Sequence, residues 1–205
     1  ETPLARGAHV ATHANLWRIS DDFWDKWPEL VAQFKQLDDW TPFRAPGAWP
    51  DADMLPLGII EFGRQTRFTP DEQRTMMTLW SIARSPLILG SDLTRLDAAT
   101  LALLTNDEVL AVNQHSANNH QLRRTPDGII IWTADAPEGK GKFLAVFNTS
   151  DREAVVPVKL ADLALTAPAI HVRDLWARRD LAPAGAVLTS TLPAHGSALF
   201  LLRPR

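Results

Sequence analysis

The chain has 205 residues, of which 45% are hydrophobic and 22% are charged, and its formal net charge is -3. These values are typical of a folded globular protein and exclude a disordered tail, a collagen-like repeat and a coiled coil. The charge and the lack of long basic runs argue against nucleic-acid binding, and no apolar run reaches the roughly 18 residues of a membrane helix. Cysteine is absent, which excludes disulfides and thiolate metal sites.

The chain begins at Glu1, without an initiator Met and without a signal peptide. We therefore expect it to be part of a longer protein. Up to about residue 115, short apolar runs alternate with helical patterns. Strands are expected over 14–19 and 86–90. Helices are expected to begin near Pro28, at a capping box over Thr69–Glu72, at Asp97, and at a second capping box over Thr105–Glu108.

Two details of these helices and the arrangement of the strands are predicted. Pro28 either breaks the first helix or begins it. The second helix is expected to bury one face, made of Met76, Leu79, Trp80 and Ala83. Strand and helix alternate at a spacing that predicts parallel βα units, and roughly three such units are too few to close an eight-stranded barrel.

After residue 118 the helical pattern ends. Short β-branched runs separated by Pro, Gly, Asp and Asn predict strands over 128–132, 142–147, 154–160, 171–176 and 198–202. This pattern is typical of an antiparallel sandwich or barrel. The expected fold class is α/β followed by all-β, with one domain over 1–118 and a second over 119–205.

Two segments carry side chains suited to chemistry. Segment 17–24 lies where a strand ends and a helix begins, so its Arg and Asp can point into a pocket. The alternative is that Ser20, Asp21 and Asp22 merely cap the following helix. Segment 49–55 places two carboxylates on one face if it is extended, where they could bind sugar hydroxyls or a cation. The alternative there is a turn rich in Pro and Asp.

Other patterns are weaker. His9 and His13 stand four residues apart, but no HExxH motif contains them, so neither a metal site nor a cofactor is expected. No Ser–His–Asp arrangement is visible. The segment Asn113–His115 is interpreted as a helix end at the domain junction. Asn148-Thr149-Ser150 matches the glycosylation sequon.

Four segments together resemble glycoside hydrolase family 27, the α-galactosidase and α-N-acetylgalactosaminidase family. They follow the order of the family and occupy most of residues 14–114. They are Trp17-Arg18 with Asp22 and Trp27, Gly47–Leu55, Leu79–Leu93 and Leu103–Gln114. Asp174-Leu175-Trp176 and His195-Gly196 resemble parts of the family's C-terminal β-domain.

The resemblance implies the last three βα units of a (β/α)8 barrel, followed by an antiparallel β-sandwich. It implies a retaining mechanism in which Asp22 is the general acid/base and Arg18 binds substrate. It places the sugar-binding wall at Trp49, Asp51, Asp53 and Met54. The family's nucleophile motif does not occur in these residues.

The implied acid has an expected environment. Asp22 should hold its proton away from bulk water, between Trp17 and Trp24, and should face the pair Asp51 and Asp53. Several departures from the family pattern leave the identity of the bound sugar open. The family's usual Asn-Asp-Pro-Asp is Pro50-Asp51-Ala52-Asp53 here, and segment 58–70 contains Arg64 and Arg67 and differs from the common pattern.

The function implied is an α-galactosidase-like retaining glycosidase that cleaves terminal α-galactosides. One alternative is a related exo-glycosidase acting on a β-L-arabinopyranoside or an α-N-acetylgalactosaminide. The other is a non-catalytic carbohydrate-binding or structural fragment. The partners implied are a carbohydrate substrate and either the N-terminal half of the barrel or a dimer partner. The 205 residues alone are expected to be inactive, and a secreted or periplasmic location is expected.

Overall fold

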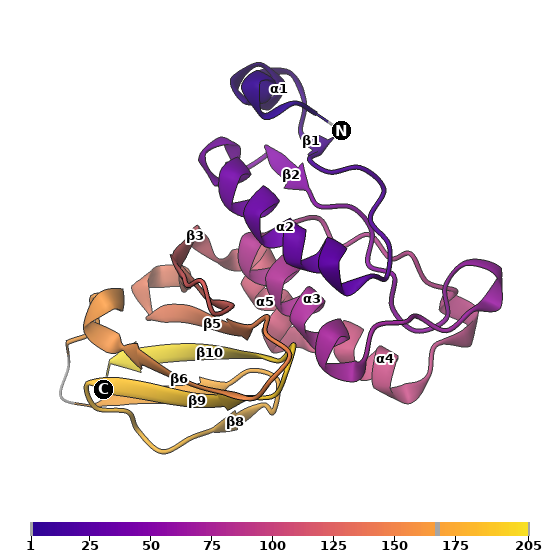
Figure 1. Ribbon diagram of the computed structural model, residues 1–205. Coiled ribbons are helices and arrows are strands. Elements are labelled where there is room, and N and C mark those ends of the chain that lie inside the picture. The colour runs from indigo at the N-terminus through magenta and orange to yellow at the C-terminus, as the bar shows by residue number, and fades with distance from the viewer. Residues whose placement is uncertain (1, 167–168, 205) are drawn as a thin grey trace. The chain divides into compact units, whose positions relative to one another are not determined.

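The computed structural model describes residues 2–166 and 169–204. The chain forms two compact units, residues 1–105 and 106–205. The first unit contains six helices and strands, which are labelled in Figure 1. They are α1 (Gly7–His13), β1 (Leu16–Arg18), α2 (Trp27–Trp40), β2 (Trp49–Asp51) and α3 (Pro70–Ala83), followed by α4 (Ala98–Leu104).

Parallel βα units are confirmed in the first unit. β1 and β2 pair in parallel from Leu16↔Trp49 to Arg18↔Asp51, and α2 connects them. α3 connects Leu55 to Leu89, which form an isolated parallel bridge. The strand predicted over 86–90 is therefore reduced to this single bridge. Pro86 contributes to this, because a proline has no N–H to donate to a strand ladder.

Pro28 begins α2 instead of breaking it. It lies in the first turn, and the preceding N-cap residue, Lys26, makes no side-chain capping bond. The interpretation of Ser20, Asp21 and Asp22 as caps of this helix is therefore wrong. The helix buries one face against the unit, made of Leu30, Gln33, Phe34, Leu37 and Trp40.

The capping box of α3 is confirmed. The Thr69 hydroxyl accepts the Glu72 N–H at 3.3 Å, and the Glu72 carboxylate accepts the Thr69 N–H at 2.8 Å. Every residue from Thr75 to Ala83 is buried, not one face alone. The C-terminal half of α3 is thus buried on all sides, unlike α2, which buries one face. It ends at Arg84 in the left-handed conformation.

The second capping box is not formed as predicted. The N-cap of α5 (Asp107–His115) is Asn106, whose side chain accepts the N–H groups of Glu108 at 3.2 Å and Val109 at 3.4 Å. Thr105 instead donates its hydroxyl to the Leu101 carbonyl. The helix continues to His115, and the predicted helix end at this point is confirmed.

The second unit is an antiparallel sandwich, as predicted. One sheet has six strands in the order β3-β4-β5-β10-β7-β8, and the other pairs β6 with β9. The strands are β3 (Ala117–Arg124), β4 (Ile129–Asp135), β5 (Lys142–Asn148), β6 (Ala154–Lys159), β7 (Ile170–Asp174), β8 (Arg179–Asp180), β9 (Val187–Leu192) and β10 (Ser197–Pro204). A shared core lies between the sheets, with Ile131, Val146 and Phe200 from one and Val156 and Leu188 from the other.

Three of these strands were not predicted: β3, β8 and β9. β3 is mostly polar and only one of its eight residues is buried, so no apolar period marks it. β9 does alternate, because Leu188, Ser190 and Leu192 are buried while the residues between them are exposed. That period of two was the signal available for β9.

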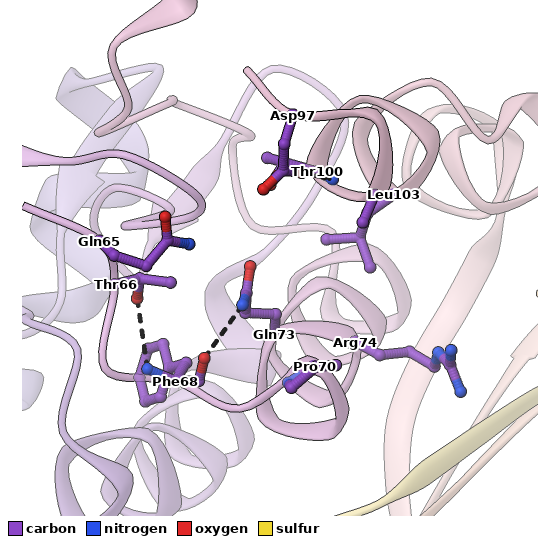
Figure 2. Close-up of a pocket in the computed structure, with 10 residues that line it drawn as sticks. Gln65, Thr66, Phe68, Pro70, Gln73, Arg74, Asp97, Thr100 and Leu103 are labelled. Carbon is purple, nitrogen blue, oxygen red and sulfur yellow. Dashed lines mark hydrogen bonds between the residues drawn. The ribbon is translucent and has the colours of Figure 1, made fainter. Parts of the chain in front are cut away.

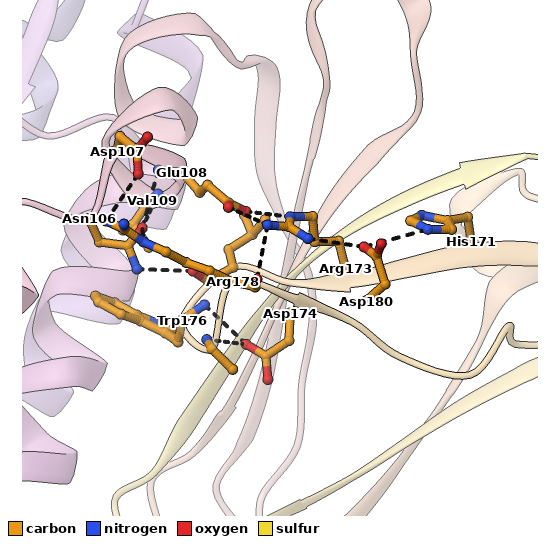
Figure 3. Close-up of polar contacts among 12 residues, drawn as sticks. Asn106, Asp107, Glu108, Val109, His171, Arg173, Asp174, Trp176, Arg178 and Asp180 are labelled. Carbon is orange, nitrogen blue, oxygen red and sulfur yellow. Dashed lines mark hydrogen bonds and ion pairs between the residues drawn. The ribbon is translucent and has the colours of Figure 1, made fainter.

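A polar network joins α5 to the six-stranded sheet (Figure 3). The guanidinium of Arg173 on β7 makes two hydrogen bonds to the Glu108 carboxylate, at 2.6 and 2.7 Å, and a third to Asp180 at 3.1 Å. The bonds to Glu108, with those to Asp180, raise the pKa of Arg173 above its ordinary value. These contacts explain why α5 belongs to the second unit, although the domain boundary at 118/119 stays a prediction.

The sequon asparagine is buried. The Asn148 amide nitrogen donates to the carbonyls of Arg152 at 2.7 Å and Pro193 at 2.8 Å, and the residue is fully buried. The nitrogen to which a glycan would be attached therefore already makes hydrogen bonds within the fold.

None of the helices in the described ranges is long and apolar enough to cross a membrane.

Candidate active site

The predicted site residues gather at the carboxyl ends of β1 and β2. Arg18 and Asp51 are the last residues of these strands and are direct partners in the parallel register. Asp22 and Asp53 follow within a few residues, so both loops leave from the same edge of the sheet. This is the edge at which parallel βα folds build their sites.

The Arg18 guanidinium lies at the centre of the group. Its Nη2 is 2.9 Å from Asp53 Oδ2 and 3.6 Å from Asp22 Oδ1. The same nitrogen donates to the carbonyls of Ser20 at 3.1 Å and Asp21 at 2.8 Å. The loop after β1 is thereby folded around its own arginine, which brings the expected acid and one member of the acidic pair to a single cation.

Asp53 is fixed by its backbone and its carboxylate. Its φ of +80° is in the left-handed region, which Asp tolerates better than most residues. Oδ2 accepts the Phe23 N–H at 2.7 Å, and the Asp53 carbonyl accepts the Trp80 indole N–H at 2.9 Å. With its side chain only 14% exposed, Asp53 has a preset orientation toward Arg18.

Asp51 is the buried member of the pair. Its Oδ1 accepts the Asp53 N–H at 2.9 Å, and the residue is almost fully buried. Burial raises the pKa of the Asp51 carboxyl, although the Asp53 N–H and the charge of Arg18 act in the opposite direction. Asp51 thus holds the backbone of Asp53 from the buried side, and Asp53 directs its carboxylate toward Arg18.

This burial gives a pH-dependent prediction. Because the folded-state pKa of Asp51 is raised, its ionised form lowers stability above that pKa, and the penalty disappears below about pH 3.9, the ordinary pKa of Asp. Asp51→Asn should therefore raise stability at neutral pH and lose this gain as the pH falls, since an amide oxygen can still accept the Asp53 N–H. Denaturant unfolding at several pH values measures the change in the free energy of unfolding. An equal change at every pH would contradict a raised pKa of Asp51.

The expected shelter of Asp22 is wrong for the described residues. Its side chain is 86% exposed, and among the described residues Arg18 is its only ion-pair partner. Trp17 does not flank it as a wall, because Trp17 is buried and packs on Trp40 with ring centroids 6.0 Å apart. Strand alternation explains this, since Trp17 and Arg18 point to opposite faces.

Trp49 and Met54 lie next to this group in the sequence, since Trp49 begins β2 and Met54 directly follows Asp53. The Arg84 guanidinium lies 4.6 Å from the centroid of the Trp49 ring, which holds this indole in place. Met54 follows Asp53 and lines a cavity of about 430 Å³, called here the Trp24 cavity. Its lining also includes Trp24, Glu61, Gly90 and Asp92. Of the residues expected to bind substrate, Met54 alone reaches this cavity.

A buried ion pair beside the site was missed from the sequence. Asp25 is completely buried and accepts hydrogen bonds from Arg64 at 2.6 and 3.0 Å and from the Arg67 N–H at 2.6 Å. Burial alone would raise the pKa of Asp25, but these hydrogen bonds outweigh it, and the pKa is lowered. The two arginines in segment 58–70 were the available signal, and their partner follows Trp24 directly.

A second cavity in the first unit contains none of the predicted site residues. It has a volume of about 390 Å³ and lies between the start of α3 and α4 (Figure 2). Its polar groups serve local structure: Gln73 donates to the Phe68 carbonyl, and Asp97 caps α4 by accepting the Thr100 N–H. Among the described residues no group of three His, Asp or Glu could hold a metal ion.

Parallel βα units with charged groups at their strand ends, followed by an antiparallel sandwich, have the architecture of part of a parallel βα barrel with a C-terminal β-domain. The family model described as alpha galactosidase A matches residues 4–115, and that of the alpha galactosidase C-terminal beta sandwich domain matches residues 126–202. The chain belongs to this alpha-galactosidase family. The family and the fold class implied by the sequence segments are thus confirmed.

Known proteins match nearly all of the chain. An alpha-galactosidase of Oryza sativa subsp. japonica is 28% identical over 93% of this chain and 44% of its own length. A GH27 β-L-arabinopyranosidase of Geobacillus stearothermophilus, solved in complex with arabinose, is 44% identical, with a TM-score of 0.95 over 100% of this chain and 48% of its own. Alpha-galactosidase I of Mortierella vinacea shares the fold at 24% identity and a TM-score of 0.85, over 97% of this chain and 55% of its own. The chain spans about half the length of these relatives.

Proposed function

We propose that this chain supplies the acid/base half of the active site of a retaining, α-galactosidase-like glycoside hydrolase. The observation that carries the proposal is the contact of Arg18 with both Asp22 and Asp53 at the strand ends. Family membership supports the same reaction class. Asp22 is the general acid/base in this proposal, because it is the one carboxylate of the group without a hydrogen bond from the backbone among the described residues.

The chemistry assigns different roles to the carboxylates. Retaining hydrolysis uses two carboxyl groups about 5–5.5 Å apart, one as acid/base and one as nucleophile. Asp51 and Asp53 accept backbone N–H groups, so they suit hydroxyl binding and support better than nucleophilic attack. The nucleophile is therefore proposed to come from outside these residues, from another segment or a partner chain, which also covers the exposed side of Asp22.

The reaction follows in two steps. Asp22 donates its proton to the glycosidic oxygen as the bond to the anomeric carbon breaks and the nucleophile bonds to that carbon. Asp22 then takes a proton from the water that displaces the nucleophile. Arg18 and Asp53 hold the sugar by hydrogen bonds to its hydroxyls, and the Trp49 ring offers a flat apolar surface to its C–H groups.

A β-L-arabinopyranoside is the second candidate substrate, because the Geobacillus enzyme that is 44% identical to this chain is a β-L-arabinopyranosidase. This sugar has the ring stereochemistry of an α-galactoside and lacks its hydroxymethyl group. A panel of aryl α-galactoside, β-L-arabinopyranoside and α-N-acetylgalactosaminide, given to the complete enzyme, separates the candidates by kcat/KM. We expect the α-galactoside to be preferred; turnover of none of the three would contradict the proposed function.

Two further expectations belong to this proposal. The 205 residues alone should hydrolyse none of these substrates, because they supply one carboxylate of the two that the mechanism needs. The secreted or periplasmic location stays a prediction.

A further inference from the structure

We infer that Trp80 and Ser85 are positioning residues for the reaction, because they fix the turn that presents Asp53 to the sugar. This inference rests on the proposed function, in which the Asp53 carboxylate accepts a hydrogen bond from a sugar hydroxyl. Trp80 belongs to the last turn of α3, and Ser85 follows that helix. Both residues are completely buried, so they act on the sugar only through the turn.

The turn that follows β2 has a backbone conformation that must be held in place. Asp53 has a φ of +80°. A residue other than glycine is strained in this region and keeps the conformation only where its surroundings impose it. One bond lies within the turn, from the Asp53 N–H to the Asp51 carboxylate. Further bonds to this backbone come from a distant part of the chain.

These further bonds come from Trp80 and Ser85. The Trp80 indole N–H donates to the Asp53 carbonyl at 2.9 Å. The Ser85 hydroxyl accepts the N–H of the preceding residue, Ala52, at 3.0 Å. Two consecutive residues of the turn are therefore bound to the C-terminal end of α3 and the segment after it. The turn cannot shift without leaving a buried group unpaired, which costs free energy.

Trp80 also supports the Asp53 carboxylate, through Phe23. The indole ring packs on the Phe23 ring with centroids 5.2 Å apart. The Phe23 N–H donates to Asp53 Oδ2 at 2.7 Å, and the same oxygen lies 2.9 Å from Arg18 Nη2. One buried tryptophan thus contacts the Asp53 backbone directly and the Asp53 carboxylate through a neighbour. Loss of its N–H should therefore loosen the carboxylate that holds the sugar in the proposed reaction.

Trp80→Phe in the complete enzyme tests the inference, because it keeps an aromatic ring beside Phe23 and removes the N–H. The substrate is the preferred aryl glycoside of the panel above. KM should rise about tenfold while kcat changes less than about threefold, since Asp53 holds the sugar both before and during bond cleavage.

The matched control is Trp132→Phe in the second unit. It removes an equally buried indole, whose N–H makes no hydrogen bond within the described residues. Both kinetic constants of this variant should stay within about twofold of the wild-type values. Equal effects of the two Trp→Phe substitutions would overturn the inference.

Ser85→Ala tests the second bond and decides the inference if Trp80→Phe does not fold. It leaves the Ala52 N–H without its acceptor and should raise KM about threefold. Its control is Ser81→Ala on α3, which removes a completely buried hydroxyl that makes no hydrogen bond in the described part of the chain. A rise in KM that is the same for both serine variants would contradict a positioning role.

A double substitution shows whether Trp80 acts through Asp53. Asp53→Gly removes the carboxylate, and glycine adopts the φ of this position without strain. In that background Trp80→Phe should change kcat/KM less than about twofold, because the group that it orients is absent. A tenfold loss in both backgrounds would show that Trp80 acts by another route.

The proposed function and the inference can fail separately. If the wild type hydrolyses the substrate and the variants match their controls, the inference alone is wrong. If the wild type hydrolyses none of the panel, the proposed function is contradicted, and calorimetry with galactose and arabinose decides the inference. Weaker binding by Trp80→Phe than by Trp132→Phe would then support it, and equal binding or no binding by the two variants would overturn it.

Discussion

Asp22→Asn in the complete enzyme is expected to lower kcat/KM about 10²–10⁴-fold for an alkyl α-galactoside, and far less for an aryl substrate with a low leaving-group pKa. An alkoxide leaves only when it is protonated, whereas an activated phenolate leaves without help. With an aryl substrate the second step becomes limiting, because the amide cannot deprotonate water. Azide needs no general base, so it should restore turnover and yield a glycosyl azide.

The control for this prediction is Asp21→Asn, which changes the neighbouring exposed carboxyl. It should keep nearly normal activity on both substrates, since the backbone carbonyl through which Asp21 accepts the Arg18 hydrogen bond is unchanged in the variant. Steady-state kinetics with the two substrates and product analysis in azide provide the measurement. Equal losses on alkyl and aryl substrates, without azide rescue, would assign the acid to another residue.

Asp25→Ala has the largest expected effect on stability. Removal of this carboxylate leaves the Arg67 N–H and the Arg64 guanidinium without their acceptor. We expect a loss of about 2 kcal/mol in the free energy of unfolding, below the roughly 3–5 kcal/mol of a fully buried pair, because the Arg64 side chain is 37% exposed.

The effect of Asp25 also depends on pH. Its lowered pKa means that its contribution is complete above the ordinary pKa of Asp, about 3.9, and is lost as the pH falls through the lowered value. The destabilisation by Asp25→Ala should therefore shrink in acid. Asp39→Ala, which removes an exposed pair with Lys35 on α2, is the control and should cost at most about 0.5 kcal/mol. Equal effects of the two variants would contradict the role of Asp25.

The sequence predicted those elements that are marked by hydrogen bonding between neighbouring residues. The Thr69–Glu72 box and the proline of α2 mark helix starts by their own hydrogen bonding, so no distant contact is needed to recognise them. β3 shows the opposite case. It is held by its ladder with β4, and its polar residues carry no local sign of that pairing.

The candidate site divides in the same way. Arg18, Asp51 and Asp53 could be brought together from the sequence, because parallel strands align their carboxyl ends. The ion pair of Asp25 and Arg64 could not, since it joins side chains 39 residues apart and neither residue lies in a helix or strand whose pairing would align them. The exposure of Asp22 was also missed. The sequence shows which residues are close to Asp22 along the chain, but it does not show how much of the side chain they bury.

One guanidinium serves two carboxylates in this site, and that sharing has a consequence for how the site can change. When Asp22 is neutralised, Arg18 is free to turn fully toward Asp53, and the loss of Asp53 releases it toward Asp22. Substitutions at the two positions will therefore be non-additive. The effect of a substitution at either carboxylate is therefore expected to depend on which residue stands at the other.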